Sequence, residues 1–288
     1  MSLLDSRSLL PLLALLAACA TKDASKSANA SDSTHTAAAA KPHQMTVVAT
    51  DYKFDAPDQV PAGMMTIHLV DNGQEMHHVA FVKLNDGKTV ADVEQALKTQ
   101  GPMPSWAVDY GGVNPPHPGG GMATTTQMLE PGNYALVCFV PSADGTPHFA
   151  KGMIKAFTVG AAPAGATATA PVADVDIKLV DYGFDLSKPL TAGTHTFAVT
   201  NGASQPHEAE LVKLAPGKTV EQLLGWMQKP AGPPPASAIG GVAGFIGDTN
   251  YFTADITPGQ YALICFLPDA KDGKPHFMHG MTKTITVM

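Results

Sequence analysis

The chain has 288 residues, which is enough for about two domains of ordinary size. Its 18 Lys and Arg against 25 Asp and Glu give a net charge of −7, so it lacks the basic surface that nucleic-acid binding requires. With 44% hydrophobic residues it is not a disordered protein, and 27 Gly and 24 Pro disfavour a coiled coil. Three Cys are too few for a disulfide scaffold in a chain of this length.

Residues 1–18 are predicted to be a signal peptide. Residues 9–18 form an apolar run that follows Arg7 and is too short to span a membrane. The end of this run, Leu16-Ala17-Ala18-Cys19, resembles the bacterial lipobox. This resemblance implies that Cys19 is acylated and anchors the protein in the cell envelope, and Ala20 favours the outer membrane, facing the periplasm. The alternative is an ordinary signal peptide in which the Cys is incidental.

Residues 19–44 are predicted to be a flexible tether. They are rich in Ala, Ser, Thr and Lys and have no hydrophobic period. Such a segment would hold the folded part of the chain away from the membrane.

The rest of the chain contains one unit twice, which we call the first repeat (45–160) and the second repeat (173–288). Several segments of the first repeat return in the second with the same order: Asp51–Asp55 as Asp181–Asp185, Gly87–Val90 as Gly217–Val220, Tyr134–Phe139 as Tyr261–Phe266, and Pro147–Phe149 as Pro275–Phe277. Residues 161–172, rich in Ala, Pro, Gly and Thr, separate the repeats as a linker. We therefore predict a tandem duplication of a whole domain.

Strand signals dominate both repeats. The predicted strands include Thr66–Val70, Tyr134–Val140 and Ile154–Val159, with their counterparts Thr196–Thr200, Tyr261–Leu267 and Thr282–Val287. One helix per repeat is expected to begin at a capping box, at Thr89 and at Thr219. The Pro- and Gly-rich stretches 101–121 and 230–247 are predicted to be long loops. Many short strands indicate an all-β fold of two tandem β-sandwich domains, each with one short helix inserted.

Each repeat carries the same four residue types in the same order: His, Cys, His and Met. Two imidazoles and one thiolate suit a trigonal copper site, and a thioether can add a weak axial contact. The candidate metal ligands are His77, Cys138, His148 and Met153 in the first repeat, and His207, Cys265, His276 and Met281 in the second. Taken singly, the cysteines fit inert buried thiols and the histidines fit turn residues, but both repeats keep all four types.

Strand alternation distinguishes His77 from its neighbour His78. In the second repeat His207 lies on the apolar face of its strand, and Glu208 lies on the opposite face. Aligning the repeats matches His77 to His207 and His78 to Glu208. We therefore expect His78 and Glu208 to point outward or to support the metal ligands from outside the ligand set.

The runs from Tyr134 through Cys138 to Met153, and from Tyr261 through Cys265 to Met281, resemble the copper loop of cupredoxins such as plastocyanin. The resemblance covers both repeats. It implies two Greek-key β-sandwiches, one type 1 (blue) copper ion in each domain, and one-electron transfer. The loops between the Cys and the second His are longer than in small cupredoxins, and His78 and Glu208 replace the family's Asn.

The residue before each candidate Cys argues against an enzyme of the oxidase or reductase type. Two-domain copper enzymes place a His beside the type 1 Cys, and here the neighbours are Val137 and Ile264. We therefore predict an electron carrier that is not an enzyme, attached to the membrane by its lipid anchor, with a redox protein of the cell envelope as partner. The alternatives are a copper-delivery protein and a metal-free interaction module with the same fold.

Overall fold

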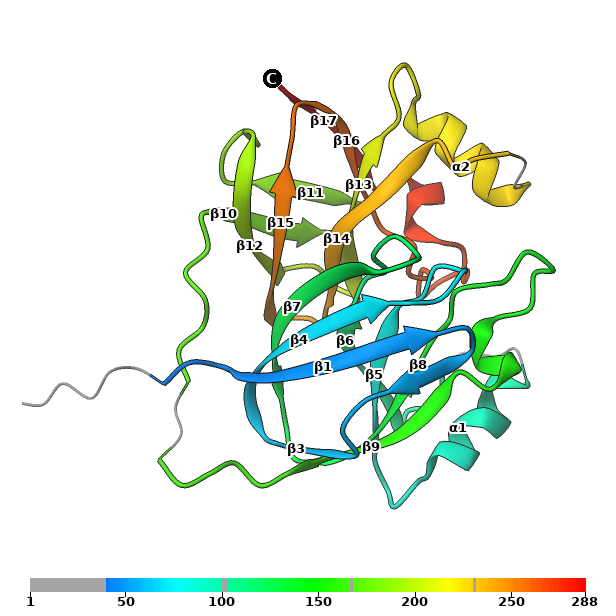
Figure 1. The fold of residues 1–288 in the computed structure, drawn as a ribbon, viewed down its shortest axis with the longest axis vertical. Coiled ribbons are helices and arrows are strands. Elements are labelled where there is room, and N and C mark those ends of the chain that lie inside the picture. The colour runs from blue at the N-terminus through cyan, green and yellow to red at the C-terminus, as the bar shows by residue number, and fades with distance from the viewer. Residues whose placement is uncertain (1–39, 100–102, 166–167, 230–231) are drawn as a thin grey trace, which may run out of the picture. The chain divides into compact units, whose positions relative to one another are not determined.

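The computed structural model describes residues 40–99, 103–165, 168–229 and 232–288 (Figure 1). The predicted signal peptide, the predicted lipidation site Cys19 and most of the predicted tether lie outside the described residues. The fold is mostly β-structure, as the sequence predicts, with one α-helix in each repeat.

The first repeat forms strands in two sheets. In one sheet, four strands of this repeat lie next to one another in the order β2 (Lys53–Asp55), β1 (His43–Thr50), β4 (Gly63–Asp71) and β7 (Gly121–Leu129). The other has five strands in the order β3 (Gln59–Pro61), β9 (Ile154–Gly160), β8 (Gly132–Val137), β5 (Val79–Leu84) and β6 (Ala107–Val113).

The second repeat forms the corresponding strands. One set runs in the order β11 (Gly183–Leu186), β10 (Val175–Val180), β12 (Gly193–Asn201) and β15 (Thr249–Ile256). The other runs in the order β14 (Ala236–Gly244), β13 (His207–Leu214), β16 (Gly259–Ile264) and β17 (Thr282–Val287).

The two repeats share a sheet. Strand β15 pairs antiparallel with β7 through Tyr251 with Thr126 and Phe252 with Thr125, so one eight-stranded sheet contains strands of both repeats (Figure 1). The described residues accordingly form one compact unit. The predicted domain boundaries at residues 45, 160 and 173 stay a prediction.

Each repeat nevertheless has its own apolar core between its two sheets. In the first repeat this core includes Phe81 and Tyr134, and in the second it includes Phe252 and Tyr261. Both tyrosines are buried, and each hydroxyl donates to the backbone carbonyl four residues upstream, at 2.9 and 2.8 Å. A buried Tyr hydroxyl needs such a partner, so these bonds fix the start of the strands that lead to Cys138 and Cys265.

The helices cover the outer faces of the sheets that carry the candidate cysteines. Helix α1 (Val90–Leu97) packs Val93 against Ala135 and Val137, and α2 (Val220–Gln228) packs in the same way on Ala262 and Ile264. Strands β8 and β16 are therefore buried on both faces, which explains their unbroken apolar sequences. Both predicted capping boxes are present. Neither helix has the length and apolarity needed to cross a bilayer, nor does any other in the described part of the chain.

The prediction of long loops at 101–121 and 230–247 was wrong in part, because β6 and β14 lie there. Both strands are rich in Gly, which has a low strand propensity. Glycines also interrupt the alternation of apolar and polar residues by which a strand is recognised in a sequence. Gly112 has φ +152, and a Cβ at this position would overlap the Val79 carbonyl oxygen. The close approach of β6 to β5 therefore needs the glycine that made the segment resemble a loop.

A buried carboxyl group lies where the repeats meet. Glu210 on β13 is 4% exposed and accepts a hydrogen bond from the Asn114 side chain of the first repeat. Burial, and then repulsion from Glu208, raises the pKa of Glu210 well above its usual 4.5. Both the folded and the unfolded protein hold this proton below pH 4.5, and only the unfolded protein loses it as the pH rises. The contribution of Glu210 to the stability of the wild-type protein therefore falls as the pH rises above 4.5.

Replacing Glu210 by Gln should remove this loss, because the amide keeps the shape of the side chain and does not ionise. We expect Glu210→Gln to raise the urea midpoint of unfolding at pH 7 and to leave it nearly unchanged at pH 4. Glu94→Gln, at an exposed helix position, is the matched control. An equal effect of Glu210→Gln at both pH values would contradict the assignment.

Candidate metal centres

Three potential metal ligands converge in the first repeat, and we call them the first donor group: His77, Cys138 and His148. One donor atom from each lies within 4.8 Å of the others. The two Nδ1 atoms are 3.0 Å apart, and the Cys138 Sγ lies 3.5 Å from His148 Nδ1. All three side chains are 0% exposed. His77 precedes β5, Cys138 follows β8, and His148 begins the 3₁₀ helix η1 (His148–Lys151).

The second donor group, His207, Cys265 and His276, repeats this arrangement. Its Nδ1 atoms are also 3.0 Å apart, and the Cys265 Sγ lies 3.2 Å from His276 Nδ1 and 3.9 Å from His207 Nδ1. His276 begins the second 3₁₀ helix, η2 (His276–His279). Cys138 and Cys265 are both free thiols.

The backbone holds the predicted methionine ligands beside these groups. The Cys138 N–H donates to the Met153 carbonyl at 3.2 Å, and the Met153 N–H donates to the His148 carbonyl at 3.0 Å. Met281 makes the same two bonds with Cys265 and His276, at 3.3 and 3.1 Å. Left-handed Gly152 and Gly280 end the 3₁₀ turns and return the chain to the core, where both methionines are fully buried.

Carboxylates on the far side of the rings determine which nitrogen faces the donor group. His77 Nε2 is 3.1 Å from Asp51 Oδ1, and His148 Nε2 is 2.6 Å from Glu75 Oε2. Burial acts to raise the pKa of both carboxyls, but the hydrogen bonds they accept, including those from the histidines, lower it overall. An ionised carboxylate only accepts, so each Nε2 carries a proton and presents Nδ1 to the donor group.

The two Nδ1 atoms are 3.0 Å apart. With both Nε2 atoms protonated, two neutral rings would oppose their Nδ1 lone pairs, and a metal ion between them would remove this repulsion. Carboxylate-bound histidines with a free nitrogen are the usual arrangement around protein-bound metals. The first donor group therefore fits a metal ion.

The second donor group differs from the first at its second histidine, His276. His207 Nε2 is 3.1 Å from Asp181 Oδ1, which matches the first repeat. His276 Nε2 is buried and has no hydrogen-bond partner among the described residues; Asp269 Oδ2 lies 3.6 Å away. Hydrogen bonds from Tyr182 and Gln205 lower the pKa of Asp269, so its carboxylate is ionised beside this ring.

The four carboxylates were not predicted as site residues. Asp51 and Asp181 stand in a repeated Asp-Tyr-x-Phe-Asp segment, and this repetition was the one signal that pointed to them. Glu75 and Asp269 occupy unrelated positions in the two repeats, so the repeat pattern could not find them.

Burial controls the protonation of the thiols. It raises the pKa of Cys138 to about 12, and it also raises the pKa of Cys265. Both thiols are therefore protonated at neutral pH without a metal, and a metal ion must displace the proton to bind sulfur as thiolate.

This displacement predicts that metal affinity rises with pH. Each donor group loses at least its thiol proton on binding a metal, so the apparent affinity should rise at least tenfold per pH unit between pH 6 and 8. Competition with a chelator of known pH dependence measures this slope. Affinity that does not change with pH would mean that the thiols take no part in binding.

His78 and Glu208 support the donor groups from outside. His78 Nε2 accepts the backbone N–H of Phe139 at 2.7 Å, and Glu208 Oε1 accepts that of Phe266, also at 2.7 Å. Both hydrogen bonds join the segment after the first histidine to the residue after the cysteine. Burial, and then repulsion by His148 and His77, lowers the pKa of His78 to about 4, which keeps its nitrogen free to accept.

Removing this acceptor should destabilise the metal-free protein. His78→Ala leaves the Phe139 N–H without a partner, which costs about 1–3 kcal/mol in the free energy of unfolding. His78→Gln provides an oxygen at a similar reach, as Glu208 does, and should recover most of the loss. Urea unfolding of both variants in the presence of a chelator tests this, and equal stability of the two would contradict it.

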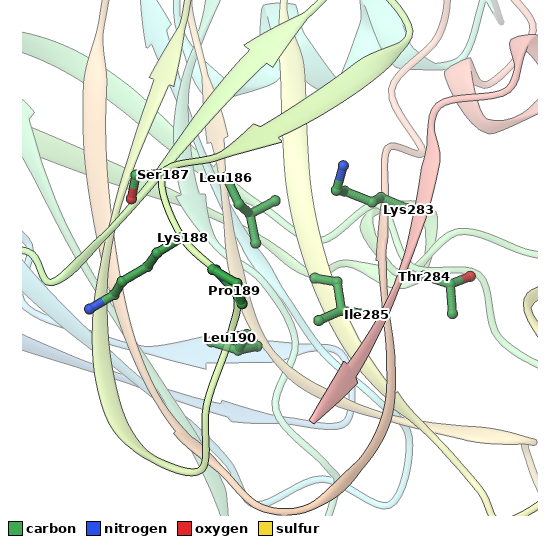
Figure 2. Close-up of a pocket in the computed structure, with 8 residues that line it drawn as sticks. All are labelled: Leu186, Ser187, Lys188, Pro189, Leu190, Lys283, Thr284 and Ile285. Carbon is green, nitrogen blue, oxygen red and sulfur yellow. The ribbon is translucent and has the colours of Figure 1, made fainter. Parts of the chain in front are cut away.

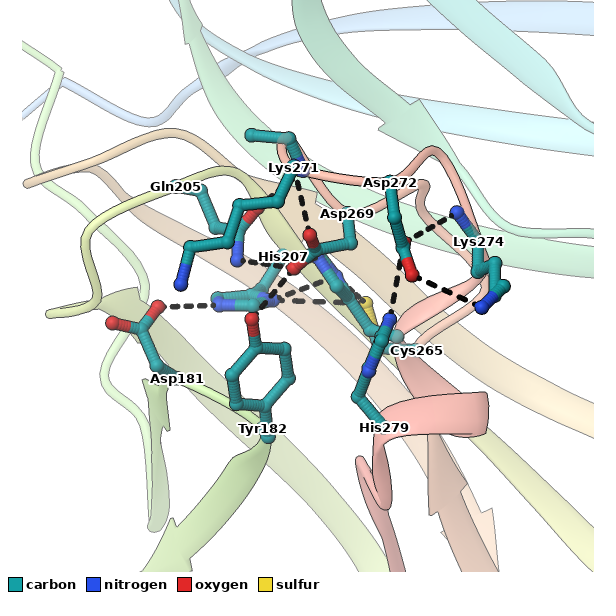
Figure 3. A network of polar contacts seen from close by, with 12 residues as sticks. Asp181, Tyr182, Gln205, His207, Cys265, Asp269, Lys271, Asp272, Lys274 and His279 are labelled. Atoms are coloured by element: carbon teal, nitrogen blue, oxygen red, sulfur yellow. Dashed lines mark hydrogen bonds and ion pairs between the residues drawn. The ribbon is translucent and has the colours of Figure 1, made fainter.

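Two other features of the second repeat lack the buried His-Cys-His arrangement of the donor groups. Asp269, Asp272 and His279 also bring donor atoms within 4.8 Å, but Asp272 forms ion pairs with His279 and Lys274, at 3.2 and 3.3 Å (Figure 3). The corresponding place in the first repeat holds the Lys151–Asp144 ion pair at 3.2 Å. Figure 2 shows the residues that line a pocket, 186–190 and 283–285, and none of the predicted ligands is among them.

No family model matches the chain, and no curated protein matches it. Solved structures similar to it include auracyanin from Roseiflexus castenholzii, at 22% identity and TM-score 0.30, covering 43% of this chain and 100% of auracyanin. A multicopper oxidase matches at 12% identity and TM-score 0.26, covering 85% of this chain and 88% of the oxidase. Copper nitrite reductase from Nitrosomonas europaea matches at 14% identity and TM-score 0.25, covering 86% of this chain and 94% of the reductase.

These similarities correct one sequence-based prediction. The chain was predicted not to be an enzyme, because Val137 and Ile264 stand where two-domain copper enzymes have a histidine. The similar structures include two kinds of enzyme, a multicopper oxidase and nitrite reductases, so that exclusion does not stand. The residue before the cysteine concerns only one route of electron transfer, and it does not decide whether the chain has an enzymatic activity.

Proposed function

We propose that each repeat binds one copper ion in a type 1 site and that the protein transfers single electrons in the cell envelope. The observation that carries this proposal is the convergence of two Nδ1 atoms and one thiol in a fully buried pocket, in both repeats. The cofactor is copper, because a thiolate with two imidazoles and a nearby thioether suits its softness and coordination.

Copper supplies a one-electron couple between Cu(II) and Cu(I), and the protein's residues determine the rest. His77, Cys138 and His148 would hold the first ion, with Met153 as a weak fourth contact, and His207, Cys265, His276 and Met281 would hold the second. The backbone bonds between the cysteine, second histidine and methionine keep the ligands in place when the charge changes. Burial excludes water from the donor atoms.

The remaining parts of the proposal concern placement in the cell. Acylation at Cys19 would anchor the chain, and residues 19–44 would hold the repeats off the membrane, in the periplasm. Each repeat, 45–160 and 173–288, would be a Greek-key sandwich of the cupredoxin type, joined by 161–172. The redox partner would be another protein of the cell envelope.

Copper loading of residues 45–288 tests the function. A blue or green thiolate-to-copper band with narrow copper hyperfine splitting in the EPR spectrum is expected, and the band should disappear on reduction and return on reoxidation. An electron carrier keeps its copper in both states, so chelators specific for Cu(II) and for Cu(I) should remove little. Rapid loss in one state would favour copper delivery, and colourless protein would contradict the type 1 sites.

A further inference from the structure

Each donor group has one carboxylate beside its second histidine, and the two carboxylates come from different positions of the repeat. In the first repeat it is Glu75, two residues before His77, and the loop after Cys138 supplies the neutral Ser142. In the second repeat the residue two before His207 is the neutral Gln205, and the loop after Cys265 supplies the carboxylate, Asp269.

A tyrosine and a neutral side chain lie beside the carboxylate in both repeats. Glu75 also forms a hydrogen bond of 2.6 Å with His148 Nε2, whereas Asp269 Oδ2 lies 3.6 Å from His276 Nε2, at ion-pair distance. In the first repeat Tyr52 OH donates to Glu75 at 3.1 Å and lies 3.3 Å from the Ser142 hydroxyl. In the second repeat Tyr182 OH donates to Asp269 at 2.6 Å, and Gln205 Nε2 donates to the same oxygen at 3.0 Å (Figure 3). The acid and its neutral neighbour have exchanged places under a tyrosine that both repeats keep.

We infer that Glu75 and Asp269 are positioning residues for His148 and His276, each holding the ring so that its Nδ1 faces the metal. This inference rests on the proposed copper sites. If this place needed only a polar side chain, a neutral residue would suffice in either repeat. Both repeats instead place one negative charge there, at different positions of the sequence. The charge favours the proton on Nε2 and leaves Nδ1 to bind.

Exchanging the pair in the first repeat tests the inference. We expect Glu75→Gln to lower the copper affinity of the first donor group 10- to 100-fold, the usual effect of losing such a partner. Adding Ser142→Asp recreates the pair of the second repeat and should restore the affinity to within about threefold. Glu94→Gln removes the same charge from an exposed helix position and should change nothing. The second donor group of the same molecule is the internal control in each chelator titration.

A measurement without metal separates this inference from the proposed function. In ¹⁵N NMR spectra of the metal-free protein, His148 should carry its proton on Nε2, and Glu75→Gln should shift the population toward Nδ1. The double variant should reverse that shift. If wild-type protein binds no copper, the proposed function fails, and the spectra still test the positioning role.

Three results would overturn the inference: unchanged affinity in Glu75→Gln, an unchanged His148 tautomer in that variant, or a double variant no better than the single one. In the second repeat, Asp269→Ser should weaken binding and Gln205→Glu with Asp269→Ser should recover it. A purely structural role would not be rescued by moving the charge to the other position.

Discussion

Cys138→Ser and Cys265→Ser should each remove about half of the thiolate-to-copper absorption of the copper-loaded protein. The two donor groups are built alike, with Nδ1 atoms 3.0 Å apart and the thiol beside the second histidine in both. Serine keeps the size of the side chain, but its hydroxyl does not bind as thiolate and so has no equivalent charge-transfer band. The variant with both changes should be colourless.

The copper content of the variants must be measured with the spectrum. Two histidines still face the pocket after either substitution, so copper can remain bound with an ordinary EPR signal. A band that survives both substitutions, or that disappears completely with one of them, would contradict two independent type 1 sites. Met153→Leu serves as the comparison, because it alters a weak contact and should change the band without removing it.

Copper-loaded protein should unfold at a markedly higher temperature than protein kept with a chelator. The donor atoms of each group come from segments that are distant in sequence, so only the folded state brings them together. Binding to the folded state alone stabilises it by about 4 kcal/mol per site when free ligand exceeds Kd 1,000-fold. With two sites filled, this is a large share of the stability of an ordinary domain, about 5–15 kcal/mol.

Calorimetry of the two forms at equal protein concentration measures this difference. Each single Cys variant should lose part of the copper-dependent gain, and the variant with both changes should lose most of it. Each variant is compared with its own metal-free form, because a serine hydroxyl at these fully buried positions lowers stability where it finds no hydrogen-bond partner. Identical unfolding of loaded and chelated wild-type protein would contradict metal binding in the buried pockets.

The features of the fold and of the donor groups that depend on local sequence pattern could be predicted before the structure was known. The apolar runs at Tyr134 and Tyr261 predicted strands buried on both faces, and the capping boxes at Thr89 and Thr219 predicted where the helices begin. The comparison of the repeats selected the histidines, cysteines and methionines, because all four types recur in the same order through loops of different length.

Features that depend on contacts between residues far apart in the chain became visible only in the folded protein. The pairing of β7 with β15 could not be predicted, since edge strands carry no sequence mark of their partner. Strands β6 and β14 were missed because the glycines that permit their close packing also weaken the strand pattern. The role of the carboxylates depends on space in the same way: Glu75 and Asp269 occupy different places in the sequence but lie beside the same ring nitrogen. A charge acts on a histidine through distance alone, so only the folded chain could show that the two are equivalent.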